Sequence, residues 1–382
     1  MKLDSYWDGD KNAMKVLFLT NIPSPYRVEF FNLLSEKCDL TVIYERRTAS
    51  DREDDWYINN NNTIKYKVHF LKGINYSNDA SIAPGVVNFL YKEKYDIIVV
   101  SGYSSATQML AITTLKLKKI PYILNVDGGI IKHESSFKRW YKTKLISGAN
   151  CYLSTGKACD EFLMHYGAPK DRLKRYPFTS IRKKDILVAP LLKSEKESYK
   201  QKVHCDYNKM ILSVGQPIPR KGFDILIKAM AQINDSSIGV YIVGGKPNDE
   251  CRELLGQYKL TNIHFVPFMK KEKLADYYKA ADLFVFPTRE DIWGLVINEA
   301  MSFGLPIITT DKCNAGLELI RENGVIVPGN NEVELTKAIN SVIDSEGISS
   351  MAAHSLDIIK KYSFEEMVQR HIEIFDEFIR IK

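Results

Sequence analysis

Residues 281–310 read ADLFVFPTREDIWGLVINEAMSFGLPIITT. The run begins with apolar residues that do not alternate with polar ones, which is typical of a strand buried on both faces of a parallel sheet. Pro287 ends this strand, a charged loop follows, and the apolar residues 294–303 predict a helix that ends at Gly304 before the next strand. The stretch therefore predicts one β–loop–α–β unit, and ligands of open parallel sheets bind at the carboxyl ends of such strands.

The start of this helix predicts a site for an anion with hydroxyl groups on both sides. Unpaired N–H groups and a partial positive charge around Gly294 and Leu295 attract phosphate, and glycine lets a ligand approach the backbone closely. Asp291 and Glu299 lie before and inside the helix, and an ionised carboxylate accepts hydrogen bonds from neighbouring hydroxyls. A phosphate between two polyols is a nucleotide sugar. The alternative for either carboxylate alone is an ordinary helix, with Asp291 complementing its dipole and Glu299 exposed.

This stretch resembles the signature of retaining glycosyltransferases of family 4, in which a Glu, seven residues and a second Glu precede Ala-Met and Gly-x-Pro. Here Asp291, shorter by one methylene, replaces the first Glu, while Glu299-Ala-Met and Gly304-Leu-Pro match. The resemblance implies an α/β chain with the GT-B fold, in which two Rossmann-like domains face each other across a cleft and the C-terminal helix crosses back to the first domain. It also implies that Glu299 binds the donor ribose, whereas Asp291 binds hydroxyls of the transferred sugar and orients it.

A second motif of the same family lies about seventy residues earlier. Relatives have Gly-Arg, four residues and Lys-Gly in the loop after a strand, and the Arg and Lys bind the diphosphate. This chain has Gly215 and Lys221-Gly222, but Gln216 stands at the place of the Arg, and Arg220 adds a cation beside Lys221. The resemblance implies that Lys221 is the principal phosphate contact and that Arg220 partly replaces the charge missing at Gln216.

Two further loops are assigned to ligand binding by the resemblance alone. In relatives the loop after the strand that corresponds to residues 263–266 borders the nucleotide base, which here points to Pro267 and Phe268. The first βα loop of relatives faces the cleft and helps to hold donor or acceptor. Its candidates in this chain are Pro25, Tyr26 and Arg27. An ordinary loop with a surface arginine is the alternative.

Asp127 follows the predicted strand 121–126 and precedes two glycines. Relatives often have a His near this point that contacts the sugar, and Asp127 is the nearest polar residue here. The resemblance makes it a candidate for hydrogen bonding to the donor sugar or to the acceptor hydroxyl, and a simple turn Asp is the alternative. Lys221, Asp291 and Asp127 are thus the predicted catalytic residues.

The length of 382 residues exceeds one usual hydrophobic core and predicts two domains. Residues 178–207 are charged and irregular, so we place the domain boundary there. A capping box at Ser363 and Glu366 opens a last amphipathic helix. We predict a flexible tail over residues 1–13 and an acceptor-binding domain over residues 14–190. A nucleotide-sugar-binding domain is predicted over residues 207–362, and the helix over residues 363–382 is expected to join the first domain.

The composition of the chain indicates which metal, nucleic-acid or membrane partners to expect. Six scattered cysteines without zinc spacing predict reduced thiols in a cytoplasmic protein, and no residue cluster predicts a metal site. The formal charge of +6 is too small to indicate nucleic-acid binding. Residues 132–184 hold thirteen Lys and Arg against four Asp and Glu, and segment 137–146 adds aromatic side chains. This segment predicts peripheral contact with an anionic membrane at the cytoplasmic face, with an ordinary solvated face as the alternative.

The predicted function is transfer of a sugar from a UDP- or GDP-linked donor to a hydroxyl of a glycan or lipid-linked acceptor. The resemblance implies retention of configuration and a role in bacterial surface polysaccharide synthesis, such as lipopolysaccharide or capsule. No cofactor besides the donor is expected, and no metal, because no metal-ligand cluster is visible in the sequence. Two alternatives stay open, namely a sugar-nucleotide epimerase of the same architecture and a non-catalytic nucleotide-binding relative. The second alternative is supported by Gln216 and Asp291, which differ from the Arg and the Glu of the family motifs.

Overall fold

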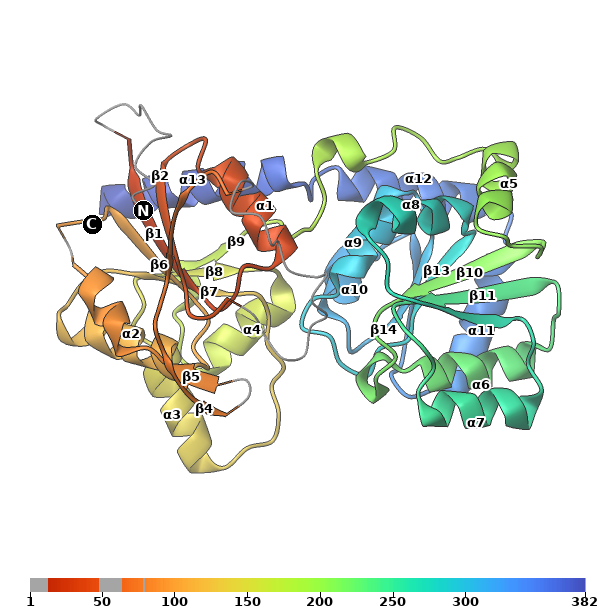
Figure 1. Ribbon diagram of the computed structural model, residues 1–382, viewed down its shortest axis with the longest axis horizontal. Helices are drawn as coiled ribbons and strands as arrows, with labels where there is room; N and C mark the ends of the chain where they lie inside the picture. The colour runs from red at the N-terminus through yellow and green to blue at the C-terminus, as the bar shows by residue number, and fades with distance from the viewer. Residues whose placement is uncertain (1–12, 48–63, 78–79, 92, 382) are drawn as a thin grey trace. The chain divides into compact units, whose positions relative to one another are not determined.

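The computed structural model describes residues 13–47, 64–77, 80–91 and 93–381, and these fold into two compact units (Figure 1). The first unit combines the chain up to Phe178 with the last helix, α13 (Phe364–Ile381), and the second runs from Thr179 to Ser363. The predicted return of the last helix to the first domain is confirmed. The predicted tail, apart from Ala13, lies outside the described residues.

A parallel sheet forms the first unit, in the order β3-β2-β1-β6-β7-β8-β9. Its strands are β1 (Lys15–Thr20), β2 (Asp39–Tyr44), β3 (Lys67–Phe70), β6 (Ile97–Ser101), β7 (Ile123–Val126), β8 (Cys151–Ser154) and β9 (Leu173–Arg175). The connecting helices are α1 (Pro25–Leu34), α2 (Ala106–Leu117), α3 (Ser136–Ile146) and α4 (Lys157–His165). A separate antiparallel hairpin contains β4 (Ile74–Ser77) and β5 (Ala80–Ile82).

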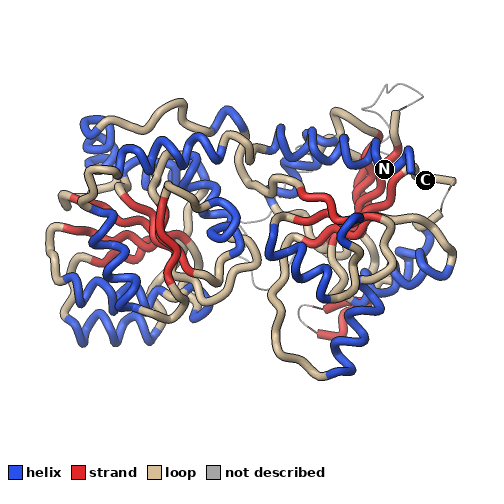
Figure 2. Tube along the Cα trace, turned by 180° about the vertical axis from the view of Figure 1, so that it is seen from behind, coloured by secondary structure: helices blue, strands red, loops and turns tan. Residues whose placement is uncertain are grey.

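The second unit has its own parallel sheet, in the order β12-β11-β10-β13-β14-β15. Its strands are β10 (Lys209–Val214), β11 (Ile238–Val243), β12 (Ile263–Val266), β13 (Leu283–Phe286), β14 (Ile307–Thr310) and β15 (Gly324–Val327). Its helices are α5 (Lys193–Lys202), α6 (Phe223–Ile233), α7 (Asp249–Tyr258), α8 (Lys271–Ala280), α9 (Leu295–Ser302), α10 (Asn314–Leu319), α11 (Glu332–Ile343) and α12 (Ile348–Ile359). Figure 2 shows helices around the strands of both units. The predicted α/β class with two Rossmann-like domains is confirmed.

Burial explains why the opening stretch of sequence forms this sheet. Every residue of β13 is fully buried, so the apolar run needs no polar face and shows no alternation. The order of strands reverses beside β10, which lies between β11 and β13. The loops that follow β10 and β13 therefore meet at one carboxyl edge of the sheet, where open α/β sheets bind their ligands.

Residues 178–207 are less irregular than the sequence predicts, because α5 forms within them. Its residues are almost all polar, so they lack the apolar periodicity that signals a helix. The helix is held instead by ion pairs from its lysines, since Lys200 lies 3.1 Å and Lys196 3.7 Å from carboxylate oxygens of Asp282. The carboxylate that binds these two lysines is distant in the chain, so the sequence around α5 does not reveal this contact.

Candidate functional site

Two basic side chains and one carboxylate meet at the carboxyl edge of the second sheet. Lys221 and Arg220 end the loop after β10, and Asp291 belongs to the loop after β13. Lys221 Nζ lies 2.7 Å from Asp291 Oδ2, and Arg220 Nη1 lies 3.4 Å from the same oxygen. The Lys221 ammonium also lies 4.7 Å from the centre of the Phe286 ring. The structure thus brings together three residues that the sequence predicts for one site.

Two glycines shape the loops that carry these residues. Gly222 has φ +70°, and a Cβ there would lie 2.1 Å from the Pro287 carbonyl oxygen. Gly294 has φ +100°, and a Cβ there would lie 2.8 Å from Cys313 Sγ. Both positions therefore require glycine on two counts, backbone conformation and space. The close approach of the two loops depends on the first, and the turn into α9 depends on the second.

Arg289 clamps the same two loops together. Its guanidinium donates to both carboxylate oxygens of Asp224 at 2.8 and 2.7 Å and to the Pro219 carbonyl at 2.5 Å. Its backbone N–H donates to the Arg220 carbonyl at 2.8 Å. The hydrogen bonds that Arg289 donates to the Asp224 carboxylate raise the pKa of Arg289 above its usual value, so this clamp is a fixed ion pair. Sequence analysis missed it, because Arg289 and Asp224 are distant in the chain and carry no motif.

Asp291 is held by its backbone as well as by its side chain. Its N–H donates to the Lys312 carbonyl at 2.9 Å, and its carbonyl accepts from the Asn314 N–H at 3.2 Å. Asp291 Oδ1 accepts from the backbone N–H of Trp293 at 3.3 Å, while Oδ2 faces the two cations. The carboxylate therefore has a defined orientation at the start of α9, and its side chain is 12% exposed.

Glu299 lies inside α9, and its carboxylate is not simply exposed as the ordinary-helix alternative has it. Oε1 accepts from the Ser180 hydroxyl and Oε2 from the Tyr278 hydroxyl, each at 3.0 Å. Burial raises the pKa of Glu299, and the two hydroxyl donors oppose that rise only in part. Each oxygen retains a further lone-pair site for a ligand hydroxyl. Ser180 and Tyr278 are functional candidates that the sequence did not indicate, since Ser180 lies 119 positions from Glu299.

The remaining predicted donor residues surround the same sheet edge less closely. Gln216 is exposed in the loop after β10, and Pro267 and Phe268 are exposed in the loop after β12. Phe268, 41% exposed, offers a free aromatic ring. Gly294 caps α9 and Leu295 is its first residue, where the first N–H groups lack helical partners. None of these side chains contacts Lys221 or Asp291 through a hydrogen bond or an ion pair in the described part of the chain.

In the first unit, the alternative of an ordinary loop with a surface arginine is wrong. Arg27 is 4% exposed and forms an ion pair with Asp127. Pro25 starts α1, and Tyr26 packs its ring at 5.8 Å from that of Phe178. Burial raises the pKa of Tyr26. The predicted candidates Arg27 and Asp127 thus belong to one cluster, which lies in a different unit from Lys221 and Asp291.

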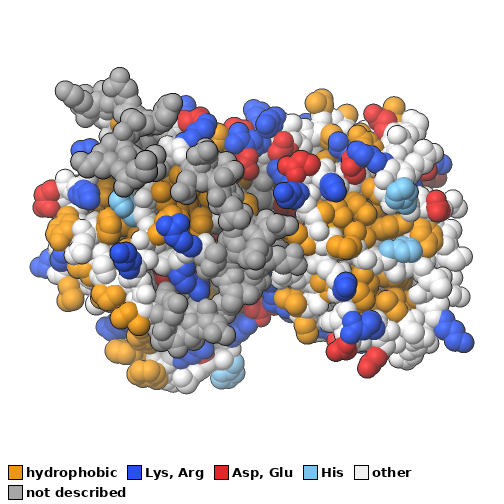
Figure 3. All heavy atoms as spheres, viewed as in Figure 1, with side chains coloured by type: hydrophobic (Ala, Val, Ile, Leu, Met, Phe, Trp, Pro, Cys, Tyr) orange, Lys and Arg blue, Asp and Glu red, His pale blue; other side chains and the backbone are white. Residues whose placement is uncertain are grey.

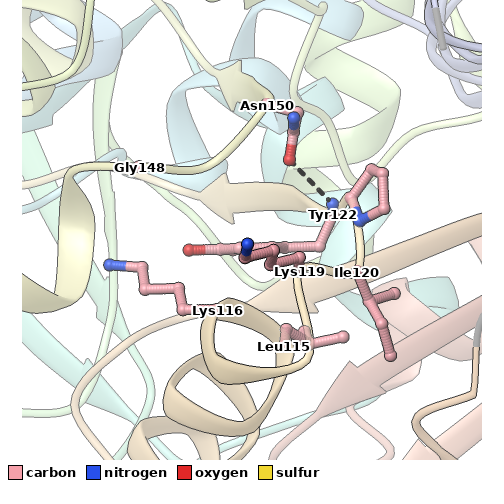
Figure 4. Close-up of a pocket in the computed structure, with 8 residues that line it drawn as sticks. Leu115, Lys116, Lys119, Ile120, Tyr122, Gly148 and Asn150 are labelled. Atoms are coloured by element: carbon pink, nitrogen blue, oxygen red, sulfur yellow. Dashed lines mark hydrogen bonds between the residues drawn. The ribbon is translucent and has the colours of Figure 1, made fainter.

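A pocket of about 270 Å³ opens at the other end of the first sheet, ahead of β7 (Figure 4). Lys116, Lys119, Tyr122 and Asn150 line it, and the Asn150 side chain accepts from the Tyr122 backbone at 3.3 Å. Lys116 is already bound to backbone carbonyls at the end of α3. The pocket therefore lies away from every predicted site residue.

Across residues 13–47, 64–77, 80–91 and 93–381, no group of three or more His, Cys, Asp or Glu side chains is placed to hold a metal ion. Over the same residues, no helix combines the length and apolar character that crossing a bilayer requires.

Comparison of the sequence with known proteins gives one family. Residues 194–360 match the model of the glycosyl transferases group 1. An uncharacterized glycosyltransferase of Methanocaldococcus jannaschii is 23% identical over 311 residues, which cover 74% of this chain and 75% of the relative. The lipopolysaccharide glucosyltransferase WaaG of Escherichia coli is 28% identical over 186 residues, 47% of this chain and 46% of WaaG. The D-inositol 3-phosphate glycosyltransferase of Rhodococcus jostii is 24% identical, and the match spans about half of it, 51%.

Solved structures agree with this assignment at the level of the fold. A glycosyltransferase from Rickettsia africae has a TM-score of 0.76 at 16% identity, covering 97% of this chain and all of its own. HepE of Anabaena, solved with UDP-glucose, has a TM-score of 0.73 at 17% identity, covering 95% and 100%. The predicted GT-B fold is confirmed. Residues 194–360, which match the model of the glycosyl transferases group 1, contain every predicted donor-binding residue.

Proposed function

We propose that this glycosyltransferase moves a sugar from a UDP- or GDP-linked donor to a hydroxyl of a glycan or lipid-linked acceptor, with retention of configuration. The observation that carries the proposal is the Lys221–Asp291 pair at 2.7 Å, beside the start of α9. A cation next to a helix N-terminus suits a diphosphate, and a neighbouring fixed carboxylate suits sugar hydroxyls. HepE, which shares the fold, is solved with UDP and with UDP-glucose.

Each residue then has a distinct part in the reaction. The bond between the sugar and the diphosphate breaks, the acceptor oxygen bonds to the same carbon, and the proton of the acceptor hydroxyl passes to the departing diphosphate. Negative charge grows on the departing diphosphate, and Lys221, Arg220 and the start of α9 stabilise it without reorganising. Asp291 binds hydroxyls of the transferred sugar. Glu299 binds the ribose through the lone-pair sites that Ser180 and Tyr278 leave open.

We further propose that the reaction needs no divalent metal, since the cations Lys221 and Arg220 meet the leaving-group charge. Phe268, exposed after β12, is the surface on which the nucleotide base stacks, and Pro267 borders it.

We propose that the protein acts at the cytoplasmic face of a membrane. Its proposed role there is in the synthesis of a bacterial surface polysaccharide. Helix α3 supports contact with an anionic bilayer, because Phe137 and Trp140 are 74% and 56% exposed on it and stack on each other at 5.9 Å. The helix carries four Lys and Arg and no Asp or Glu. Figure 3 shows orange and blue side chains together at the lower end of the first unit, where Figure 1 labels α3. Exposed aromatic and basic side chains on one helix are typical of interfacial membrane binding.

A panel of UDP- and GDP-sugars tests the proposal. We expect slow release of nucleoside diphosphate from one donor in water and faster release with a suitable acceptor, with the anomeric configuration of the product retained by NMR. Conversion of the donor sugar without release of diphosphate would indicate the epimerase instead. Tight binding of the nucleotide with no turnover of any donor would indicate a non-catalytic relative.

A further inference from the structure

The first unit contains a buried hydrogen-bond network around Asp127. Its side chains come from four places in the chain, namely Arg27 on α1, Asn125 on β7, Asp127 after β7 and Tyr176 after β9. Arg27 pairs with Asp127 Oδ2 and also donates to Asn125 Oδ1 at 3.4 Å. The Tyr176 hydroxyl accepts from Asn125 Nδ2 and donates to Asp127 Oδ1, both at 3.0 Å. Arg27 and Tyr176 therefore both bind the Asp127 carboxylate, and Asn125 links these two partners to each other.

Exposure singles out one member of this network. Asn125, Tyr176 and Arg27 are 1%, 2% and 4% exposed, whereas the Asp127 side chain is 24% exposed. An ionised carboxylate has about four lone-pair sites. Arg27 and Tyr176 occupy two of them, and Asn125 Nδ2 makes a long contact of 3.5 Å. Asp127 can thus accept a hydrogen bond from outside the protein, while its partners cannot be reached.

The network fixes the Asp127 carboxylate with more partners than a stabilising ion pair alone would require. A buried pair is weak support for stability, because an apolar pair of similar volume often does as well. Here a planar guanidinium fixes one carboxylate oxygen and a phenol fixes the other, so the orientation of the carboxylate is set from two directions. It lies at the carboxyl edge of the sheet, one strand from the point beside β1 where the strand order reverses.

We propose that Arg27 and Tyr176 are positioning residues that orient the carboxylate of Asp127, the residue that the family resemblance already makes a candidate to accept a hydrogen bond from a sugar hydroxyl. This assignment rests on the proposed transfer function. It changes the expected role of Arg27, which the family resemblance makes a direct ligand of donor or acceptor. The hydroxyl belongs to the acceptor or to the donor sugar, and the two sources differ in the reactions that they affect.

The last helix takes part in the same arrangement. His371 on α13 is fully buried and packs its ring at 4.6 Å from that of Tyr176. Its Nδ1 lies 2.7 Å from the Met367 carbonyl, which fixes the ring. The ring of His371 on α13 therefore packs against Tyr176 and helps to fix its position.

A double-mutant cycle tests the proposal. Initial rates of transfer are measured for wild type, Asp127→Asn, Arg27→Met and the double variant, together with hydrolysis of the donor in the absence of acceptor. We expect a loss in kcat/KM of roughly 100-fold for Asp127→Asn and 10- to 100-fold for Arg27→Met. The double variant should be no worse than Asp127→Asn alone, because Arg27 acts only through that carboxylate. Tyr176→Phe should cost about tenfold, and Arg27→Lys should restore part of the loss.

A second ion pair of the same unit serves as the control. Arg175 Nε lies 2.6 Å from Asp160 Oδ2, and Arg175→Met and Asp160→Asn should leave transfer unchanged. Melting temperatures of all variants report folding, and the charge-neutral double variant and Tyr176→Phe cover the case in which Arg27→Met does not fold.

The pattern of losses decides the outcome. Loss of transfer without loss of donor hydrolysis assigns the hydroxyl to the acceptor, and loss of both assigns it to the donor sugar. Multiplicative losses in the double variant would overturn the positioning role, and normal transfer by a folded Asp127→Asn would overturn the whole inference. In that last case wild-type transfer would still stand, so failure of the inference is distinct from failure of the proposed function.

Discussion

Replacing Lys221 by alanine should remove most of the transfer activity while the chain stays folded. The ammonium of Lys221 has three N–H donors. One of them is directed to Asp291 at 2.7 Å, and the side chain, only 13% exposed, is also fixed over Phe286. The remaining donors are therefore preorganised for a phosphate oxygen.

The size of the loss follows from this geometry. One preorganised contact to a developing charge is worth about 3 kcal/mol, which corresponds to a loss of 100-fold or more in rate. Arg220 lies 3.4 Å from the same carboxylate oxygen but is 46% exposed, so it replaces only part of the missing charge. We expect Lys221→Ala to lower kcat/KM by roughly 100- to 1000-fold and Arg220→Ala to be clearly milder.

The assay is release of nucleoside diphosphate under initial-rate conditions, with the melting temperature measured on the same samples. Lys228→Ala is the matched control, because Lys228 pairs with Asp224 at 3.7 Å in the same unit and its loss changes the charge equally. A Lys221→Ala variant within threefold of wild type and folded would refute the assignment. Equal losses for Arg220→Ala and Lys221→Ala would show that both cations reach the diphosphate.

Other predictions test separate parts of the account. Gln216→Arg should tighten binding of the donor, and unchanged affinity would mean that position 216 does not face the phosphates. Activity should persist in EDTA, whereas complete loss that Mn²⁺ or Mg²⁺ restores would contradict metal independence. Glu299→Ala should abolish transfer. Because burial raises the pKa of Glu299, the folded state binds that proton more tightly than the unfolded state, and wild type loses stability as pH rises from the unfolded value of about 4.3 through the raised value. The melting temperature of Glu299→Gln relative to wild type should therefore rise between pH 4 and pH 7, and a constant difference would disprove the shift. Vesicles with anionic lipid should sediment the chain, less so at high salt and less so for Phe137→Ala with Trp140→Ala. Equal binding to neutral vesicles would refute the charge contribution.

The fold could be predicted from the sequence because its main signals are local. The apolar run of β13, the glycine before α9 and the Ser363 and Glu366 pattern before α13 each lie within a few residues of the structure that they predict. The glycines at 222 and 294 are also local signals, since each has a positive φ and little space for a side chain.

The environment of the site residues could not be predicted in the same way. Arg27 follows Pro25 and Tyr26 in a segment that reads as an exposed loop, yet its partner Asp127 lies 100 positions away. Glu299 meets Ser180 across 119 positions, and α5 depends on Asp282 rather than on its own periodicity. Contacts of this kind arise only when the sheet orders neighbouring strands, so a single sequence carries no pattern for them.

A structure of the full chain with bound UDP or GDP tests the central claim most directly. We predict a diphosphate oxygen at about 2.7 to 2.9 Å from Lys221 Nζ, the phosphates at the start of α9, and the ribose hydroxyls on Glu299. A nucleotide bound elsewhere, with its phosphates out of hydrogen-bond reach of Lys221 and α9, would contradict the account.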